Sequence, residues 1–230
     1  MSNTEAPSRS ERAGVTRSPG TSSRSAAAAA RRQQLLEVAE ALFLDAGYGK
    51  TSVSRIVKTA GVAQGTFYLY FASKEAILLE LRRGVLRRLR RSFKEASHSS
   101  EGAADARLAA GFVAVAAEVV RNIPLLRQFR SAETAVQTEQ VVLDGRASMA
   151  APIEALIHDG VATHAFVVDS VPIAAHAALS LFSDLIYTSA AYGEPAPTDV
   201  LVPATTRLLL RGLGVAPPRI DALIPAPETS

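Results

Sequence analysis

Residues 51–81 read TSVSRIVKTAGVAQGTFYLYFASKEAILLEL, and this stretch decides the fold. Its first part spaces apolar residues by three and four, which predicts a short helix with one apolar face. These residues are Val53, Ile56, Val57 and Ala60. Because glycine adopts a positive φ without steric cost, Gly61 suits a tight turn in which Val62 fills the angle between two helices. A helix-turn-helix is therefore predicted.

A second short helix is predicted over residues 64–71. Phe67 and Phe71 are four residues apart, so both can point into one small core. The side chains left outside carry an amide and hydroxyl groups, which suit phosphate oxygens and the edges of bases in DNA. They are Gln64, Thr66, Tyr68 and Tyr70. Ser73 is placed to cap the following helix, and Lys74 behind it is expected to act as a cation for phosphate.

Positive charge is concentrated in the first part of the chain. Residues 1–97 contain 17 Lys and Arg against 8 Asp and Glu, a net charge of +9. The remaining residues contain 8 against 14, a net charge of −6, which leaves +3 for the whole chain. Such an excess alone fits a solvated surface equally well. Because it coincides with the helix-turn-helix, it favours double-stranded DNA as the partner, whose phosphates attract basic side chains.

The stretch AGVAQGTFYLYFASKEAILLEL, preceded by RRQQLLEVAEALFLDAGYGKTS, resembles the DNA-binding domain of the TetR family of transcriptional regulators. The resemblance covers residues 31–81. It implies an all-α homodimer whose recognition helices enter successive major grooves of DNA, usually as a repressor that a ligand releases.

The resemblance also implies which residues contact DNA. They are Thr51, Ser52, Gln64, Gly65, Thr66, Tyr68, Tyr70 and Lys74. The first two are expected at phosphates, Gln64 and Thr66 at bases, and the tyrosines and the lysine at the backbone. Since Gly65 has no side chain, base recognition is expected to rest on few residues and on the shape of the DNA.

Composition limits the other classes of function. The chain has 230 residues, of which 48% are hydrophobic and 6% aromatic, enough for one moderate core and a small second domain. It contains no cysteine, so disulfides and thiolate chemistry are excluded and a cytoplasmic location is expected. We expect no membrane span, since the nearest apolar candidate, residues 170–183, is short of the roughly 18 residues required.

Four segments are predicted along an all-α chain, since no segment shows sustained alternation of apolar and polar residues. Residues 1–25 have few large apolar side chains and are expected to form a disordered basic arm. Residues 26–81 form an N-terminal three-helix helix-turn-helix domain for DNA binding. A larger helical ligand-binding and dimerisation domain follows over residues 82–214, and residues 215–230 are expected to form a flexible Pro-rich tail.

Prolines are expected to interrupt the helices of the second domain, because proline has no N–H to donate. Pro124 is expected to end one helix and let a short one begin at Leu125. Pro152 is expected to kink or divide a helix over residues 137–159. Two further helices are predicted over residues 170–192 and 198–213.

Two helical stripes that include small residues predict a dimer interface. The residues are Ile173, Ala177, Leu181 and Leu185 on one helix and Leu201, Thr205, Leu208 and Gly212 on the next. The pattern alone fits a helix hairpin within one chain equally well, and the resemblance favours the dimer. A two-fold dimer would set its recognition helices roughly 34 to 36 Å apart and require a palindromic operator.

Four large apolar residues on separate helices are predicted to line a cavity for a small, uncharged hydrophobic effector, although they fit a plain core as well. They are Phe112, Phe129, Met149 and Phe182. The histidines His158, His164 and His176 are not spaced as a metal pair on one helix, and no phosphate-binding glycine loop or nucleophile motif is present. No enzymatic activity, cofactor or metal is therefore expected.

The sequence thus predicts a DNA-binding transcriptional regulator, a repressor that binds a palindromic operator as a homodimer and is released by a small hydrophobic effector. The alternative is a DNA-binding regulator controlled by a protein partner rather than a small molecule. A helical enzyme of unrecognised type is a third possibility.

Overall fold

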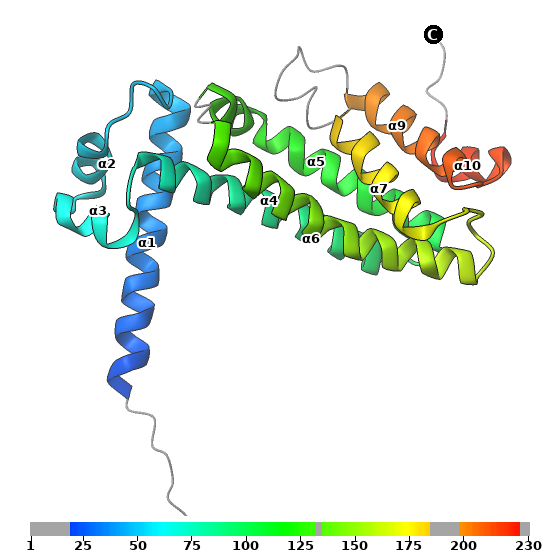
Figure 1. Cartoon of the computed structure of the whole chain (residues 1–230), viewed down its shortest axis with the longest axis horizontal. Coiled ribbons are helices and arrows are strands. Elements are labelled where there is room, and N and C mark those ends of the chain that lie inside the picture. The colour runs from blue at the N-terminus through cyan, green and yellow to red at the C-terminus, as the bar shows by residue number, and fades with distance from the viewer. Residues whose placement is uncertain (1–18, 132–134, 185–197, 226–230) are drawn as a thin grey trace, which may run out of the picture.

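The computed structural model of the chain describes residues 19–131, 135–184 and 198–225, and all regular structure within these ranges is helical (Figure 1). The helices are α1 (Pro19–Ala46), α2 (Val53–Ala60), α3 (Gln64–Tyr70), α4 (Lys74–Ser99), α5 (Ala104–Ser131), α6 (Ala135–Ala162), α7 (Val171–Phe182), α9 (Thr198–Gly212) and α10 (Pro217–Leu223). No strand occurs in these ranges, so the all-α prediction is confirmed.

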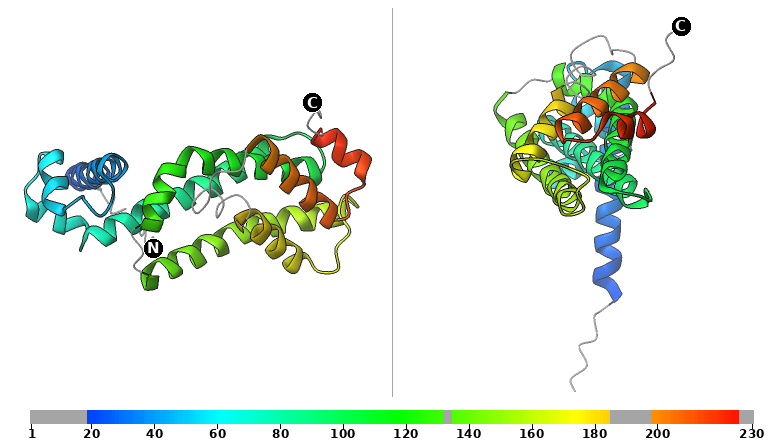
Figure 2. Two further views of the ribbon diagram at one scale, coloured as in Figure 1. Left: turned by 90° about the horizontal axis from the view of Figure 1, so that it is seen from above. Right: turned by 90° about the vertical axis from the view of Figure 1, so that its right-hand side faces the viewer.

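Helices α1, α2 and α3 form a small head at one end of the molecule, and α4 runs from the head into a larger helical body (Figure 1). In the body, the long helix α4 packs against both α5 and α6, and α5 also packs against α6 (Figure 2). Helix α7 packs on α6, and α9 packs on α5 and α7. Because α4 belongs to both parts, it connects the head to the body.

The ends of the short helices follow from local chemistry. The hydroxyl of Ser52 accepts a hydrogen bond from the backbone N–H of Arg55, and that of Ser73 accepts one from Ala76, so both serines cap a helix as their residue types predict. Gly61 closes α2 with a φ of +65°, the left-handed conformation that favours glycine. The predicted helix-turn-helix is therefore present, with α3 ending at Tyr70, one residue before its predicted end.

A compact core holds the head together. Phe43 of α1, Ile56 of α2, Phe67 of α3 and Ile77 of α4 are fully buried and belong to one hydrophobic cluster. Each helix of the head therefore contributes at least one large side chain to a shared core, and this core fixes the angle at which α3 is presented.

Helix α1 begins earlier than its sequence suggests. It starts at Pro19, inside the segment expected to be a disordered arm, whereas residues 1–18 lie outside the described residues. Proline fits the first turn of a helix because that turn needs no N–H, and the alanine run over residues 26–30 favours helix. Residues 24–31 are exposed, and this part of α1 projects away from the head (Figure 1).

Neither internal proline divides its helix. Helix α5 continues through Pro124, contrary to the expected end of a helix there, and α6 continues through Pro152, so it is not divided at that residue. The residues next to each proline are held by the core, since Leu125, Leu126 and Ile153 are buried. Packing on both sides therefore offsets the one helical hydrogen bond that each proline removes.

By length and composition alone, residues 104–129 of α5 would suffice to cross a membrane. The prediction that residues 170–183 are the segment most like a membrane span is therefore corrected. More than half of the most apolar window of α5 is buried inside the protein. Central helices of globular domains have this character, because they are covered by apolar neighbours on several sides.

Residues 217–223 are helical and packed on the body rather than extended. The sequence predicts a flexible tail over residues 215–230, but residues 217–223 form α10, and Ile220 is fully buried. Arg219 donates from Nε and Nη2 to the two carboxylate oxygens of Asp105, at 2.7 and 3.1 Å. This bidentate ion pair fixes α10 to the beginning of α5, while residues 226–230 lie outside the described residues.

We expect Asp105→Asn to lower the free energy of unfolding by about 1.5 to 3 kcal/mol at neutral pH, the range for a hydrogen bond to a charged group. Hydrogen bonds from Arg219 hold the pKa of the Asp105 carboxyl below its ordinary value, against the effect of burial. Stability from this pair is therefore present above about pH 4 and is lost as the pH falls through the lowered pKa. Urea unfolding at pH 7 and pH 3 tests this. An equal difference in the free energy of unfolding between wild type and variant at both pH values would contradict it.

Candidate DNA-binding interface and effector cavity

Helix α3 and its C-cap direct two phenylalanines into the core and leave Gln64 and Tyr68 exposed. Phe67 is fully buried and Phe71 nearly so, and their rings lie 5.8 Å apart, as predicted. Gln64 and Gly65 are exposed, Thr66 and Tyr70 are half-buried, and 52% of Tyr68 is exposed. The amide of Gln64 and the hydroxyl of Tyr68, four residues apart, therefore share one accessible face that suits contact with base edges and phosphates, whereas Thr66 and Tyr70 lie on the other side of α3.

Leu69 is a residue of this surface that the sequence pattern did not single out. It lies between Tyr68 and Tyr70 on α3, and 81% of it is exposed, more than any other large apolar side chain among the described residues. A leucine so exposed on a short helix has little role in the fold of the head. Its position was predictable only from the burial of its neighbours Phe67 and Phe71, which leave residue 69 on the opposite face.

Thr51 does not occupy the position that the resemblance implies. Only 1% of it is exposed, and its Oγ1 donates to the carbonyl oxygens of Gly47 and Leu42 at 2.9 and 3.3 Å. Its hydroxyl therefore fastens the loop between α1 and α2 and is not available to a phosphate. Ser52, the next residue, is exposed at the beginning of α2, where its backbone position suits an anion.

Lys74 is tied to the head rather than extended into solvent. Its Nζ donates to the backbone carbonyl of Tyr48 at 2.9 Å and lies 4.0 Å from the centre of the Tyr48 ring. The Tyr48 hydroxyl donates to Glu75 at 3.0 Å, and burial together with this carboxylate raises the pKa of Tyr48. Lys74 thus holds the loop before α2 against α4, so its predicted role as a simple phosphate cation is incomplete.

Comparison with known proteins agrees with this geometry. The family described as bacterial regulatory proteins, tetR family, matches residues 35–81, from the middle of α1 to the first turns of α4. Residues 35–81 are a TetR-family DNA-binding domain. The resemblance predicted from the sequence is therefore confirmed for the head.

Among TetR-type relatives, the transcriptional repressor KstR2 of Mycobacterium tuberculosis is 46% identical over 56 residues, which are 24% of this chain and 28% of that repressor. Three other relatives match this chain over only 18% to 36% of their own length. The likeness in sequence is therefore confined to the DNA-binding domain.

Two solved structures share the fold of most of the chain. A TetR/AcrR-family transcriptional regulator of Thermobifida fusca has a TM-score of 0.63 at 25% identity, covering 79% of this chain and 97% of that structure. The fatty acid degradation regulator FadR of Bacillus halodurans has a TM-score of 0.65 at 19% identity, covering 81% and 97%. The body of this TetR-type chain therefore has a known arrangement of helices.

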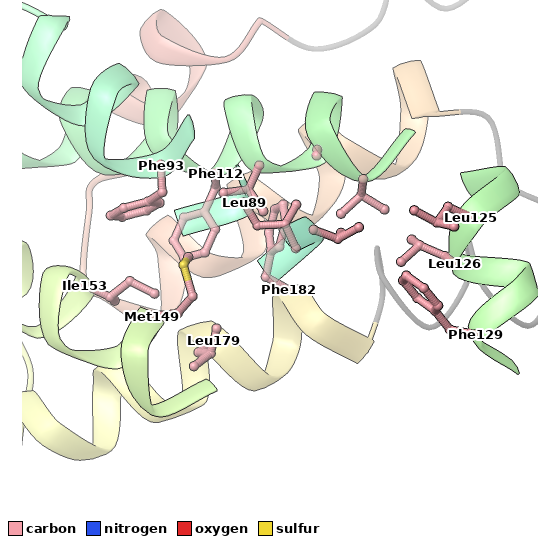
Figure 3. Packing of buried hydrophobic residues seen from close by; sticks show 14 of the residues in the cluster. Leu89, Phe93, Phe112, Leu125, Leu126, Phe129, Met149, Ile153, Leu179 and Phe182 are labelled. Carbon is pink, nitrogen blue, oxygen red and sulfur yellow. The ribbon is translucent and has the colours of Figure 1, made fainter. Parts of the chain in front are cut away.

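A cavity of about 80 Å³ lies between α4, α5, α6 and α7 in the body. Phe112, Met149 and Phe182 line it, as predicted, and the rings of Phe112 and Phe182 are 4.7 Å apart. Phe129 does not line it. Figure 3 shows Phe129 beside Leu125 and Leu126, apart from the other three, and Arg82 lies over its ring at 5.8 Å. Its assignment to the cavity is therefore corrected.

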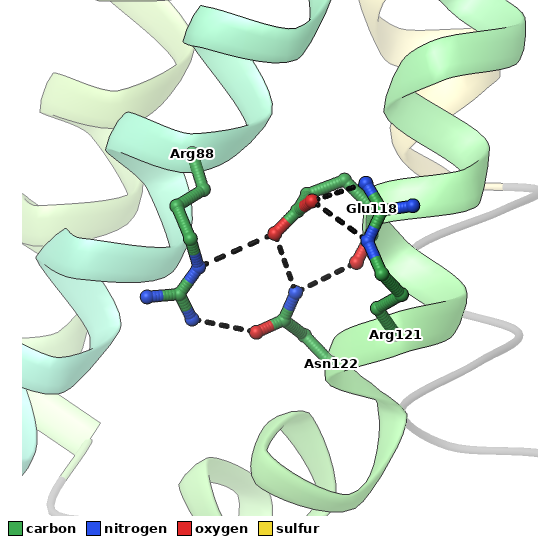
Figure 4. Close-up of polar contacts among 4 residues, drawn as sticks. All are labelled: Arg88, Glu118, Arg121 and Asn122. Atoms are coloured by element: carbon green, nitrogen blue, oxygen red, sulfur yellow. Dashed lines mark hydrogen bonds and ion pairs between the residues drawn. The ribbon is translucent and has the colours of Figure 1, made fainter. Parts of the chain in front are cut away.

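A polar network centred on the buried residues Glu118 and Asn122 joins α4 to α5 (Figure 4). Arg88 of α4 donates from Nε to Glu118 at 3.2 Å and from Nη2 to Asn122 at 2.6 Å. Arg121 and the amide of Asn122 also donate to Glu118, which is 7% exposed. Burial alone would raise the pKa of the Glu118 carboxyl, but these hydrogen bonds outweigh it and lower the pKa. The network fixes how α4 packs on α5.

The predicted dimer residues fall into four groups. Ile173, Ala177, Leu208 and Gly212 are exposed, while Leu181 and Leu201 are half-buried. Thr205 is 2% exposed and faces the core, and Leu185 lies outside the described residues. The exposed stripe of α9 contains Val200, Ala204 and Leu208 instead. One residue of shift turns a helix by about 100°, which is why Thr205 was misplaced.

Among the described residues, no group of three or more His, Asp or Glu side chains is arranged to hold a metal ion. His158, His164 and His176 are each exposed.

Proposed function

We propose that this chain is a sequence-specific transcriptional regulator, a repressor that binds a palindromic operator as a homodimer and leaves it when a small apolar effector binds the body. The observation that carries the proposal is the accessible face of α3, with Gln64 and Tyr68 exposed on a helix that Phe67 anchors. Repression is supported by the relative KstR2, which is named a transcriptional repressor.

Dimerisation is supported by apolar side chains that the fold leaves exposed on α7 and α9. Ile173 is 71% exposed, Val200 52% and Leu208 53%. Exposed apolar residues gathered on neighbouring helices are typical of protein interfaces. A two-fold pairing through these helices would present two copies of α3 to successive major grooves.

Release by an effector is supported by the position of α5. This helix lines the cavity through Val115 and Val119 and also reaches the head, where Oε1 of Gln128 accepts a hydrogen bond from the backbone N–H of Tyr48 at 3.1 Å. A ligand that moves α5 therefore acts on the same loop that Lys74 and Thr51 fasten. The effector need only bind the DNA-free arrangement better than the DNA-bound one.

The proposal predicts that Thr66→Ala and Tyr68→Ala each weaken operator binding. A side chain that contacts a base edge or its phosphate contributes about 1 to 3 kcal/mol, so the dissociation constant is expected to rise roughly ten- to a hundred-fold. Fluorescence anisotropy with a labelled operator measures this. The control is Val167→Ala, which truncates a side chain that is 76% exposed in the body. If both α3 variants bind as tightly as the control, α3 is not the reading helix.

A further inference from the structure

The cavity in the body is lined mostly by apolar residues, and its polar lining residues are Ser183 and Arg146. Arg146 of α6 is the only charged residue among those that line it, and the large lining residues beside it are Leu, Val, Phe and Met. Arg146 is half-buried, and a guanidinium partly withdrawn from water at the wall of an apolar cavity is costly unless it has a partner.

Arg146 has no carboxylate partner within the described part of the chain. None of the ion pairs there includes it, whereas Arg88, Arg107 and Arg219 each pair with an Asp or Glu. Its one hydrogen bond runs from Nη2 to Oγ of Ser180 on α7, at 2.7 Å. The serine fixes the direction of the side chain without neutralising it, and most of the five donors of the guanidinium stay available.

We infer that the effector of this protein has an apolar body and an anionic head, and that Arg146 binds the head while Phe112, Met149 and Phe182 enclose the body. This rests on the proposed function and replaces the uncharged ligand predicted from the sequence. A carboxylate and a phosphate monoester both match the planar fork of arginine. An uncharged ligand would fill the cavity but supply no counter-ion to the guanidinium.

The size of the cavity limits the apolar part. At about 80 Å³ it has roughly half the volume of a cavity that holds benzene, so a chain of several carbons enters only if a side chain moves. Met149 is suited to this, because its thioether side chain is flexible and adapts to irregular spaces. We therefore expect the apolar part of the ligand to be of moderate length.

The test is calorimetric titration of the full-length dimer with straight-chain alkanoates from hexanoate to decanoate, the alcohols of the same lengths, and octyl phosphate. We expect the best alkanoate to bind at least about tenfold more tightly than its alcohol, since a hydrogen bond to a charged group has roughly that effect. Stronger binding of octyl phosphate than of octanoate would identify the head as a phosphate.

Three variants make the test specific. Arg146→Met is expected to bind acid and alcohol equally, and Arg146→Lys to retain part of the preference through its charge. Arg90→Met removes the same charge from an exposed site on α4 outside this lining and should keep the full preference. Circular dichroism confirms that each variant is folded. The inference is overturned if the alcohols bind as well as the acids, if Arg146→Met keeps the preference, or if no anion in the series binds.

Repeating the ligand titrations with operator DNA present tests the anion site and the release of DNA separately. If octanoate binds through Arg146 but leaves the complex with DNA intact, the anion site stands and release by an effector fails. If the alcohols release DNA as effectively as the acids, release by an effector stands and the anionic head fails.

Discussion

Leu208→Glu is expected to separate the dimer into monomers that keep their fold and no longer bind a palindromic operator. Leu208 is 53% exposed on α9, so the substitution does not disturb the core of one chain. In a two-fold interface the change occurs twice, and each buried, unpaired carboxylate costs several kcal/mol. Dimer affinity is therefore expected to fall by two or more orders of magnitude. A monomer presents one copy of α3 and loses the second half-site.

Sedimentation and operator binding, measured on the same sample, check this prediction. The matched control is Leu143→Glu, which places the same charge on α6 at a residue that is 51% exposed. This control is expected to remain dimeric and to bind the operator as wild type does. If Leu208→Glu is also dimeric and active, the interface does not involve the exposed face of α9.

Phe67→Ala is expected to unfold the head while the body stays intact. Phe67 is the fully buried side chain that fastens α3, and its ring contacts those of Tyr68 and Phe71. Removing a buried phenylalanine costs about 3 to 5 kcal/mol, a large fraction of the stability of so small a domain. We expect thermal unfolding to split into two transitions, with the lower one assigned to the head, and binding to all DNA to be lost.

Leu69→Ala is the control on the same helix, because this side chain is 81% exposed and contributes little to the core. Its unfolding curve is expected to match that of wild type. Ligand titration of Phe67→Ala reports on the body and is expected to be unchanged. A single unfolding transition for Phe67→Ala at the wild-type temperature would show that the core of the head does not depend on α3.

The head could be predicted from the sequence because its signals are local. The spacing of Val53, Ile56 and Val57, the turn at Gly61 and the cap Ser73 all act within a few residues, and each is present in the structure. Thr51 shows where such reasoning ends. Its burial depends on carbonyl groups of Leu42 and Gly47, which only the closed loop brings to its hydroxyl.

The parts that the sequence did not predict depend on contacts between distant residues. The tail becomes a packed helix because Arg219 meets Asp105, 114 positions away in the chain. Arg146 has no neighbours in sequence that mark it as part of a cavity, since its partner Ser180 and the lining residue Phe112 lie on other helices. The chemistry of the ligand could therefore be inferred only after the helices of the body were assembled.

The most direct test of the central claim is to select DNA fragments from a random pool with the full-length protein and to sequence those that bind. The account predicts an enriched palindrome whose two half-sites are centred about one turn of B-DNA apart, because two copies of α3 would read successive major grooves. Thr66→Ala should alter the enriched sequence within each half-site without changing the spacing. Enrichment of a single unpaired half-site, or of no sequence at all, would contradict it.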